Sequence, residues 1–256
     1  MRSSNDFGRL GDQPTHPELL DWLATELLAR GQSLKAMHRL VLASATYRMA
    51  ATAAPGGLAS DPTNDALWRF DRRRLTAEEV RDSILAVTGV LRLELGGPSV
   101  YPPMPAEVLA TASRPEDAWG TSTPEQAARR SLYVHVKRSL PEPLLATFDR
   151  ADTDGSCPVR FATVQPTQAL TMMNGDFAQQ QAAVFAERLR REAPDLRSRL
   201  ALGLRLVTQR PADPADVERL VVLANDLQRE HGRDEAMALQ RCCLVLLNTN
   251  AFLFLD

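Results

Sequence analysis

The sequence predicts a mainly α fold, an irregular multi-helix domain with long Pro/Gly loops and at most one short pair of extended segments. Three observations support this prediction. Apolar residues recur at helical spacing along most of the chain, helix-capping residues precede several of these stretches, and the alternation typical of a strand occurs in one candidate segment. With 256 residues, 44% of them hydrophobic, the chain is long enough to bury a large core. We expect a single domain over residues 1–256, with a weak subdivision near residue 120.

The first two expected helices form an antiparallel pair. The first can be capped by Thr15, has Pro17 in its first turn and ends at Gly31. Ser33 caps the second, which extends to about Tyr47. The apolar stripes of the pair are Leu19, Leu20, Trp22, Leu23, Leu27 and Leu28 in the first helix, and Leu34, Met37, Leu40, Val41 and Ala45 in the second.

A third helix is expected after a surface connection at residues 49–64, which is rich in Ala, Gly, Pro and Thr. Thr76 and Glu79 have the spacing of a capping box, and Gly89 ends the helix. Its inward-facing residues are Val80, Ile84, Leu85 and Val87. Residues 96–105 cannot form regular structure, because their prolines remove hydrogen-bond donors and their paired glycines relax the backbone.

The second half of the chain adds one strand candidate and five helices. Residues 131–138 alternate apolar with polar side chains, but no clear partner strand exists, so this segment can instead lie extended across helices. The five helices are expected at residues 166–173, 177–191, 196–208, 214–230 and 234–247. The last is apolar nearly all round, which predicts a central position.

Composition and charge exclude several classes of protein. The net charge of −2 gives no global attraction to nucleic acid, and 28 of the 30 basic residues are Arg, which is typical of codon bias in a GC-rich genome. The polar start of the chain is unlike a signal peptide, and the apolar run at residues 242–247 is far shorter than the roughly 20 residues of a membrane helix. The three cysteines form no disulfide framework and no metal or haem spacing, so we expect buried thiols.

Three local clusters of polar residues have a functional and a structural interpretation. The acidic run at residues 149–154 resembles a calcium loop but fails its register, so an acidic surface turn is favoured. His16 and His38 lack metal-ligand spacing, which favours capping or packing roles. Arg69, Arg72, Arg73 and Arg74 precede Glu78, Glu79 and Asp82; an intramolecular network is favoured over an anion site. We expect no metal site and no cofactor.

Three blocks of the chain carry a family pattern. The first contains Asn5-Asp6-Phe7-Gly8, His16-Pro17-Glu18-Leu19-Leu20-Asp21-Trp22-Leu23-Ala24 and Leu34-Lys35-x-x-His38-Arg39-Leu40. The second contains Arg72-Arg73-Arg74-Leu75-x-x-Glu78-x-x-Arg81-Asp82 and Gly96-Gly97-Pro98. The third contains Arg130-Ser131-Leu132-Tyr133, Phe148-Asp149, Cys157-Pro158-x-Arg160-x-x-Thr163-x-x-Pro166-x-Gln168, Met173-Asn174 and Leu246-Leu247-Asn248. In order and spacing, these blocks resemble the family of the domain of unknown function 1553, a planctomycete family.

The resemblance implies large exported proteins in which this domain ends the chain. A cytochrome c-like module and a companion domain precede it there, and carbohydrate-binding modules sometimes accompany it, so these are the partners to expect. The family domain usually starts with a further segment rich in Asn, Arg, Trp and Gly. We therefore expect this chain to be an N-terminally incomplete domain, either a truncated gene product or a fragment, and its compartment does not follow.

The family pattern also singles out polar positions, although it supplies no established catalytic residue. These positions are Asp6, Arg9, His16, Arg72, Arg73, Glu78, Arg81, Asp82, Asp149, Arg160, Gln168 and Asn174. Buried charges need partners, so they either form Arg-carboxylate networks or line a cleft, and we expect carboxylate partners for Arg72, Arg73, Arg81 and Arg160.

Two functions remain open from the sequence. The leading hypothesis is a noncatalytic structural or interaction domain, whose loops at residues 96–104 and 149–160 present a partner surface. The alternative is an enzyme domain acting on extracellular polysaccharide with redox partners. Its candidate catalytic residues are Asp6, His16, Asp149 and Arg160, and the candidate binding residues are Arg72, Arg73, Glu78, Arg81, Asp82, Gln168 and Asn174.

Overall fold

The chain divides into two compact units in the computed structural model, which describes residues 3, 5–157 and 159–255. Unit 1 comprises residues 1–73, 157–159 and 256, and unit 2 comprises residues 74–156 and 160–255. Pro158 of the family pattern lies outside the described residues. The division between the two units follows Arg73, and both the single domain and the weak subdivision near residue 120 stay predictions.

Unit 1 contains the expected helix pair, α1 (Pro17–Ala29) and α2 (Leu34–Ala43). The N-cap of α1 is His16 rather than Thr15, whose hydroxyl oxygen lies 3.0 Å from His16 Nδ1. Ser33 caps α2 as predicted, by accepting a hydrogen bond from Ala36 N. The second helix ends earlier than expected, because Ser44 is extended and its hydroxyl accepts the Tyr47 N–H.

A short helix, α3 (Pro55–Ser60), interrupts the segment expected to be a connection. Pro55 begins it, a position where the missing N–H costs nothing. No residue of α1, α2 or α3 is buried, and the apolar stripe of α1 leaves Trp22 48% exposed. The helices of unit 1 therefore form without a core of their own.

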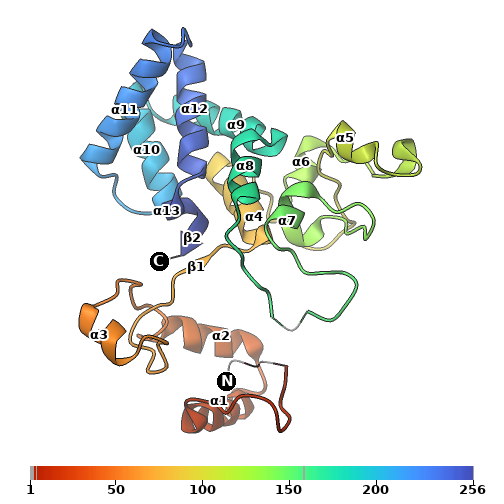
Figure 1. Ribbon diagram of the computed structural model, residues 1–256, viewed down its shortest axis with the longest axis vertical. Coiled ribbons are helices and arrows are strands. Elements are labelled where there is room, and N and C mark those ends of the chain that lie inside the picture. Colours follow the sequence, from red (N-terminus) through yellow and green to blue (C-terminus); the bar gives the residue numbers. More distant parts are fainter. Residues whose placement is uncertain (1–2, 4, 158, 256) are drawn as a thin grey trace. The chain divides into compact units, whose positions relative to one another are not determined.

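Unit 2 contains the other helices of the described chain, and the mainly α prediction is confirmed (Figure 1). Its α-helices are α4 (Ala77–Thr88), α5 (Ala106–Leu109), α6 (Pro124–Ala127), α7 (Pro143–Thr147), α8 (Pro166–Asn174), α9 (Asp176–Glu192), α10 (Leu196–Thr208), α11 (Pro214–Arg229), α12 (Glu235–Leu247) and α13 (Asn250–Leu253). Two 3-10 helices are η1 (Pro115–Asp117) and η2 (Ser131–Tyr133). Strands β1 (Arg73–Arg74) and β2 (Phe254–Leu255) pair in a two-stranded sheet, and Leu75 N donates to Leu253 O beside it.

The core of unit 2 surrounds α12, which packs against α9, α10 and α11 (Figure 1). Gly203 of α10 allows this close packing, since a Cβ there would lie 2.9 Å from Leu246 Cδ1 of α12. Burial raises the pKa of the Cys242 thiol to about 11 and that of Cys243 further, so neither forms a thiolate readily. The prediction of a central helix with buried thiols is confirmed for this pair, whereas Cys157 is exposed.

Of the two interpretations of residues 131–138, the strand is wrong, and the residues after Tyr133 are extended, as in the alternative. The first residues of this segment form η2, because the Ser131 N–H and hydroxyl both donate to Asp82 Oδ1 at 2.7 Å. The following residues lie extended against the Pro/Gly loop: Val100 N donates to Tyr133 O at 2.8 Å, and His135 N donates to Val100 O at 2.9 Å. These two hydrogen bonds form a parallel bridge between Val100 and Val134, which joins the loop to the extended segment.

Candidate functional site

Asp149 is the centre of a polar cluster in unit 2. Its Oδ2 accepts hydrogen bonds from Arg74 Nη2 at 2.6 Å and from Thr163 N at 2.8 Å. Thr163 Oγ1 donates to the carboxylate at 3.0 Å, and Gln168 Nε2 lies 3.4 Å from it. The Arg74 guanidinium also lies over the Phe148 ring, 5.0 Å from its centroid. These donors occupy the carboxylate and connect β1 to the segment before α8.

Arg81 is the centre of a second cluster, and only 1% of the residue is exposed. Its Nη1 donates to Arg129 O at 3.0 Å and to Ser131 Oγ at 3.2 Å, and its Nη2 donates to Ala127 O. Asp82 Oδ1 lies 3.7 Å from Arg81 Nη1. Burial lowers the pKa of Arg81, while Glu142 and Asp82 act against this shift. The side chain thus connects α4 to the end of α6 and to η2.

The other candidate residues are distributed over both units. In unit 2, Arg160 Nη2 donates to both carboxylate oxygens of Glu78 at 2.9 and 2.6 Å, and Gln168 Nε2 donates to Thr147 O at 3.1 Å. Asn174 is exposed at the end of α8. In unit 1, Asp6 Oδ1 accepts the Gly8 N–H in an exposed turn, and His16 stands at the N-cap position of α1 without a side-chain hydrogen bond to the helix.

Carboxylate partners were predicted for four arginines, and the structure bears on two of these predictions. Arg81 and Arg160 have carboxylate neighbours, as predicted. For Arg72 and Arg73, which occupy exposed positions, the pairing stays a prediction. Asp149, the first residue of the acidic run, accepts hydrogen bonds from Arg74 and Thr163, and no group of metal-ligating side chains occurs among the residues that the structure describes.

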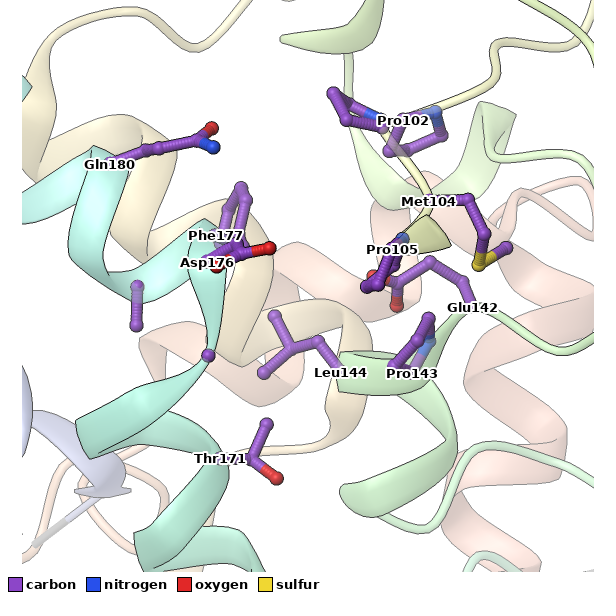
Figure 2. A pocket seen from close by; sticks show the side chains of 13 residues that line it. Pro102, Met104, Pro105, Glu142, Pro143, Leu144, Thr171, Asp176, Phe177 and Gln180 are labelled. Atoms are coloured by element: carbon purple, nitrogen blue, oxygen red, sulfur yellow. The ribbon is translucent and has the colours of Figure 1, made fainter. Parts of the chain in front are cut away.

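A pocket of about 140 Å³ lies in unit 2 between the loop at residues 102–105, the start of α7 and the start of α9 (Figure 2). Most of its lining is apolar. The lining residues are Pro102, Pro103, Met104, Pro105, Glu142, Pro143, Leu144, Thr171, Gly175, Asp176, Phe177, Ala178 and Gln180. Asp149 and Arg160 are not among them. An apolar cavity with a few polar groups is the usual form of a ligand site.

Glu142 is the buried polar group of this pocket. The residue is 7% exposed, and in Figure 2 its side chain extends from the start of α7 toward the space facing α9. Its Oε2 accepts the Leu145 N–H at 2.7 Å and so caps α7. Burial raises the pKa of Glu142, and Arg81 and Arg150 act in the opposite direction. The pocket therefore contains a carboxyl group whose protonation depends on the balance between its burial and the charges of Arg81 and Arg150.

An open aromatic hollow of about 440 Å³ lies close to the same loop. The Tyr101 ring lies 4.8 Å from the His135 ring and 5.6 Å from the Trp119 ring, between centroids. Trp119 Nε1 donates to Pro102 O at 2.9 Å. Pro102 also lines the Glu142 pocket, so this hydrogen bond holds one residue of the pocket wall in position.

Sequence reasoning missed Glu142. A local signal was present, because the run Pro141-Glu142-Pro143 places an acceptor side chain before a proline that can begin a helix. That signal predicts a helix start but gives no information about burial, which depends on the loop at residues 102–105 and on α9.

Comparison with known proteins identifies the family of the chain but no individual similar protein. Residues 1–224 match the model of a family described as "PSD1: Protein of unknown function (DUF1553)". No curated protein and no solved structure matches the chain. Within the described residues, none of the helices has the length and apolar character needed to cross a membrane.

Proposed function

The chain belongs to the DUF1553 family, and from this premise we propose that it is a noncatalytic interaction domain. The main observation behind the proposal is that hydrogen-bond donors surround the Asp149 carboxylate. Four donor groups from Arg74, Thr163 and Gln168 lie within hydrogen-bond distance of this carboxylate. A carboxylate that accepts this many hydrogen bonds from distant segments stabilises the fold.

The other polar residues of the family pattern support the same proposal. Arg81 donates to Arg129 O at 3.0 Å and to Ser131 Oγ, and Arg160 donates to Glu78. Each connects segments that are distant in the sequence, as expected for charges that hold helices and loops in register.

The loop at residues 96–104 is the proposed partner surface. Arg129 holds it by donating to Pro98 O at 3.1 Å, to Glu94 O at 3.3 Å and to Gly96 O, while its guanidinium lies 4.0 Å from the Tyr133 ring centroid. A loop held in one conformation loses little entropy when a partner binds. The partners that the family resemblance suggests are the cytochrome c-like and companion domains.

The enzyme alternative has less support from the geometry. Catalysis by Asp149 would require the carboxylate to release its donors, and Arg160 would have to leave Glu78. Purified chain incubated with a panel of polysaccharides should show no turnover above a heat-denatured control. Reproducible turnover that Asp149→Asn abolishes would overturn the proposal.

Asp149→Asn should instead reduce stability. The substitution removes the charge that Asp149 places beside the Arg74 side chain, which is 4% exposed. We expect the free energy of unfolding to fall by about 2 kcal/mol, measured by urea denaturation followed by circular dichroism. The matched control is Asp216→Asn, because Asp216 pairs with Arg219 on the surface of α11 and such pairs contribute little. Equal stability of the two variants would contradict a structural role for Asp149.

A further inference from the structure

The helix pair of unit 1 exposes large apolar side chains. Leu20 and Leu28 of α1, and Leu34 and Val41 of α2, are each more than 40% exposed. Neither helix contains a buried residue. A large exposed apolar patch is rare on a monomeric protein and usually marks an interaction site. The pair therefore has the character of an interface.

These apolar side chains follow the helical repeat. The stripes are Leu20, Ala24 and Leu27 on α1, and Leu34, Met37 and Val41 on α2. The short connection at residues 30–33 is typical of an antiparallel pair. Leu23 and Leu40 are only partly exposed, as expected where the two helices meet. The rotation from Leu23 to the first stripe and from Leu40 to the second has the same sense, which in an antiparallel pair places both stripes on one side.

The charges of the two helices are opposite. α1 carries Glu18, Asp21 and Glu26 and no basic residue, whereas α2 carries Lys35 and Arg39 and no acidic residue. Glu26 forms an ion pair within unit 1, but the described part of the chain provides no ion-pair partner for the other four. Such a helix pair is complementary to a second copy of itself if α1 of one copy packs against α2 of the other.

From the exposed apolar stripes and the opposite charges we infer that the helix pair is a self-association surface, on which a second copy of the chain docks its own helix pair. α1 of each copy lies against α2 of the other in a two-fold symmetric arrangement of four helices. An arrangement with α1 against α1 would bring like charges together. The inference concerns unit 1 alone and goes beyond the partner surface proposed at residues 96–104.

The first test is sedimentation equilibrium of the full chain over a range of concentrations. One face of two helices makes an interface at the small end of the usual range, so we expect a weak dimer with a dissociation constant on the order of 50 µM. A chain that stays monomeric at about ten times this concentration would overturn the inference and leave the face to a different protein.

Charge reversal identifies the face that associates. In a homodimer of Glu18→Lys/Asp21→Lys, both helices are basic, and in a homodimer of Lys35→Glu/Arg39→Glu, both are acidic. Each double variant should therefore weaken self-association by at least about tenfold. An equimolar mixture of the two variants restores opposite charges at every contact and should associate about as tightly as the wild type. A variant that had merely unfolded could not be rescued in this way.

The matched control is Asp216→Lys/Asp226→Lys, because both residues lie on α11 of unit 2 and pair with arginines of the same helix. Its dissociation constant should equal that of the wild type. Equal weakening by this control, or a mixture that fails to associate, would overturn the inference. So would a dimer that both double variants leave unchanged, since the contact would then lie on another surface.

Failure of these tests leaves the noncatalytic proposal intact, because that proposal rests on residues of unit 2.

Discussion

Arg81 shows how a single buried side chain organises unit 2. The guanidinium is almost fully buried, yet its hydrogen bonds go mainly to backbone carbonyl groups at residues 127 and 129 rather than to a carboxylate. Its Nε has no hydrogen-bond partner among the described residues. The family pattern indicated that Arg81 matters, but the sequence alone could not identify backbone partners more than forty residues away.

Arg81→Ala should be strongly destabilising. It removes the donors of two carbonyl groups and of Ser131, and it leaves a cavity in the core. We expect a loss of about 3 kcal/mol in the free energy of unfolding, measured by urea denaturation. Arg219→Ala, which breaks an exposed i,i+3 pair, is the control and should change stability by less than about 0.5 kcal/mol. If both variants change the free energy of unfolding by a similar amount, the buried hydrogen bonds of Arg81 do not contribute to stability as expected.

Glu142 should give stability a characteristic pH dependence. Burial raises its pKa above the ordinary value of 4.5, so the folded state binds this proton more tightly than the unfolded state. Its contribution to stability is therefore largest in acid and falls as the pH rises from the ordinary carboxyl pKa through the raised one. We expect the Tm of the wild type, relative to Glu142→Gln, to fall as the pH rises above the ordinary value of 4.5. A difference that is constant, or that rises with pH, would contradict the shift.

At the scale of elements, local sequence signals placed the long helices well. The predicted helix at residues 196–208 matches α10, and the predicted caps at Ser33 and Thr76 are observed. Short helices were missed because four or five residues show no periodicity. One signal was still present: Thr123 and Gln126 form the capping box of α6, which sequence reasoning did not use.

The capping box of α4 provides a test at this scale. Thr76 accepts the Glu79 N–H through its hydroxyl, and Glu79 Oε2 accepts the Thr76 N–H at 2.8 Å. Because α4 is buried against α7 and α9, loss of the cap should lower global stability. We expect Thr76→Ala to cost about 1 kcal/mol in thermal or urea unfolding, and Thr76→Ser to restore most of it. No difference between Ala and Ser would exclude a contribution from the hydroxyl.

At the scale of the whole molecule, the two units differ in how much they bury. Unit 2 has a contiguous core that includes Val80, Phe185 and Leu246, all at most 1% exposed. The helices of unit 1 contain no buried residue. Since burial of apolar surface is the main driving force of folding, most of the stability resides in unit 2.

Residues 74–256 should therefore fold without residues 1–73. This fragment retains the hydrogen bond from Leu75 N to Leu253 O and all the core helices of unit 2. We expect a cooperative urea transition with a midpoint near that of the full chain, whereas residues 1–73 alone should show no cooperative transition. An unfolded 74–256 fragment, together with one transition of the full chain that involves both units, would instead support the single domain predicted from the sequence.

By itself the sequence determined the family, the mainly α class and the position of the long helices. These features depend on local periodicity, on caps such as Thr76 and on residue order, all of which a linear chain displays. Only the tertiary structure decided that Asp149 is saturated with donors, that Arg81 bonds to distant carbonyls and that Glu142 lies in an apolar pocket. Hydrogen-bond partners and burial arise between segments far apart in the chain, so no local pattern specifies them.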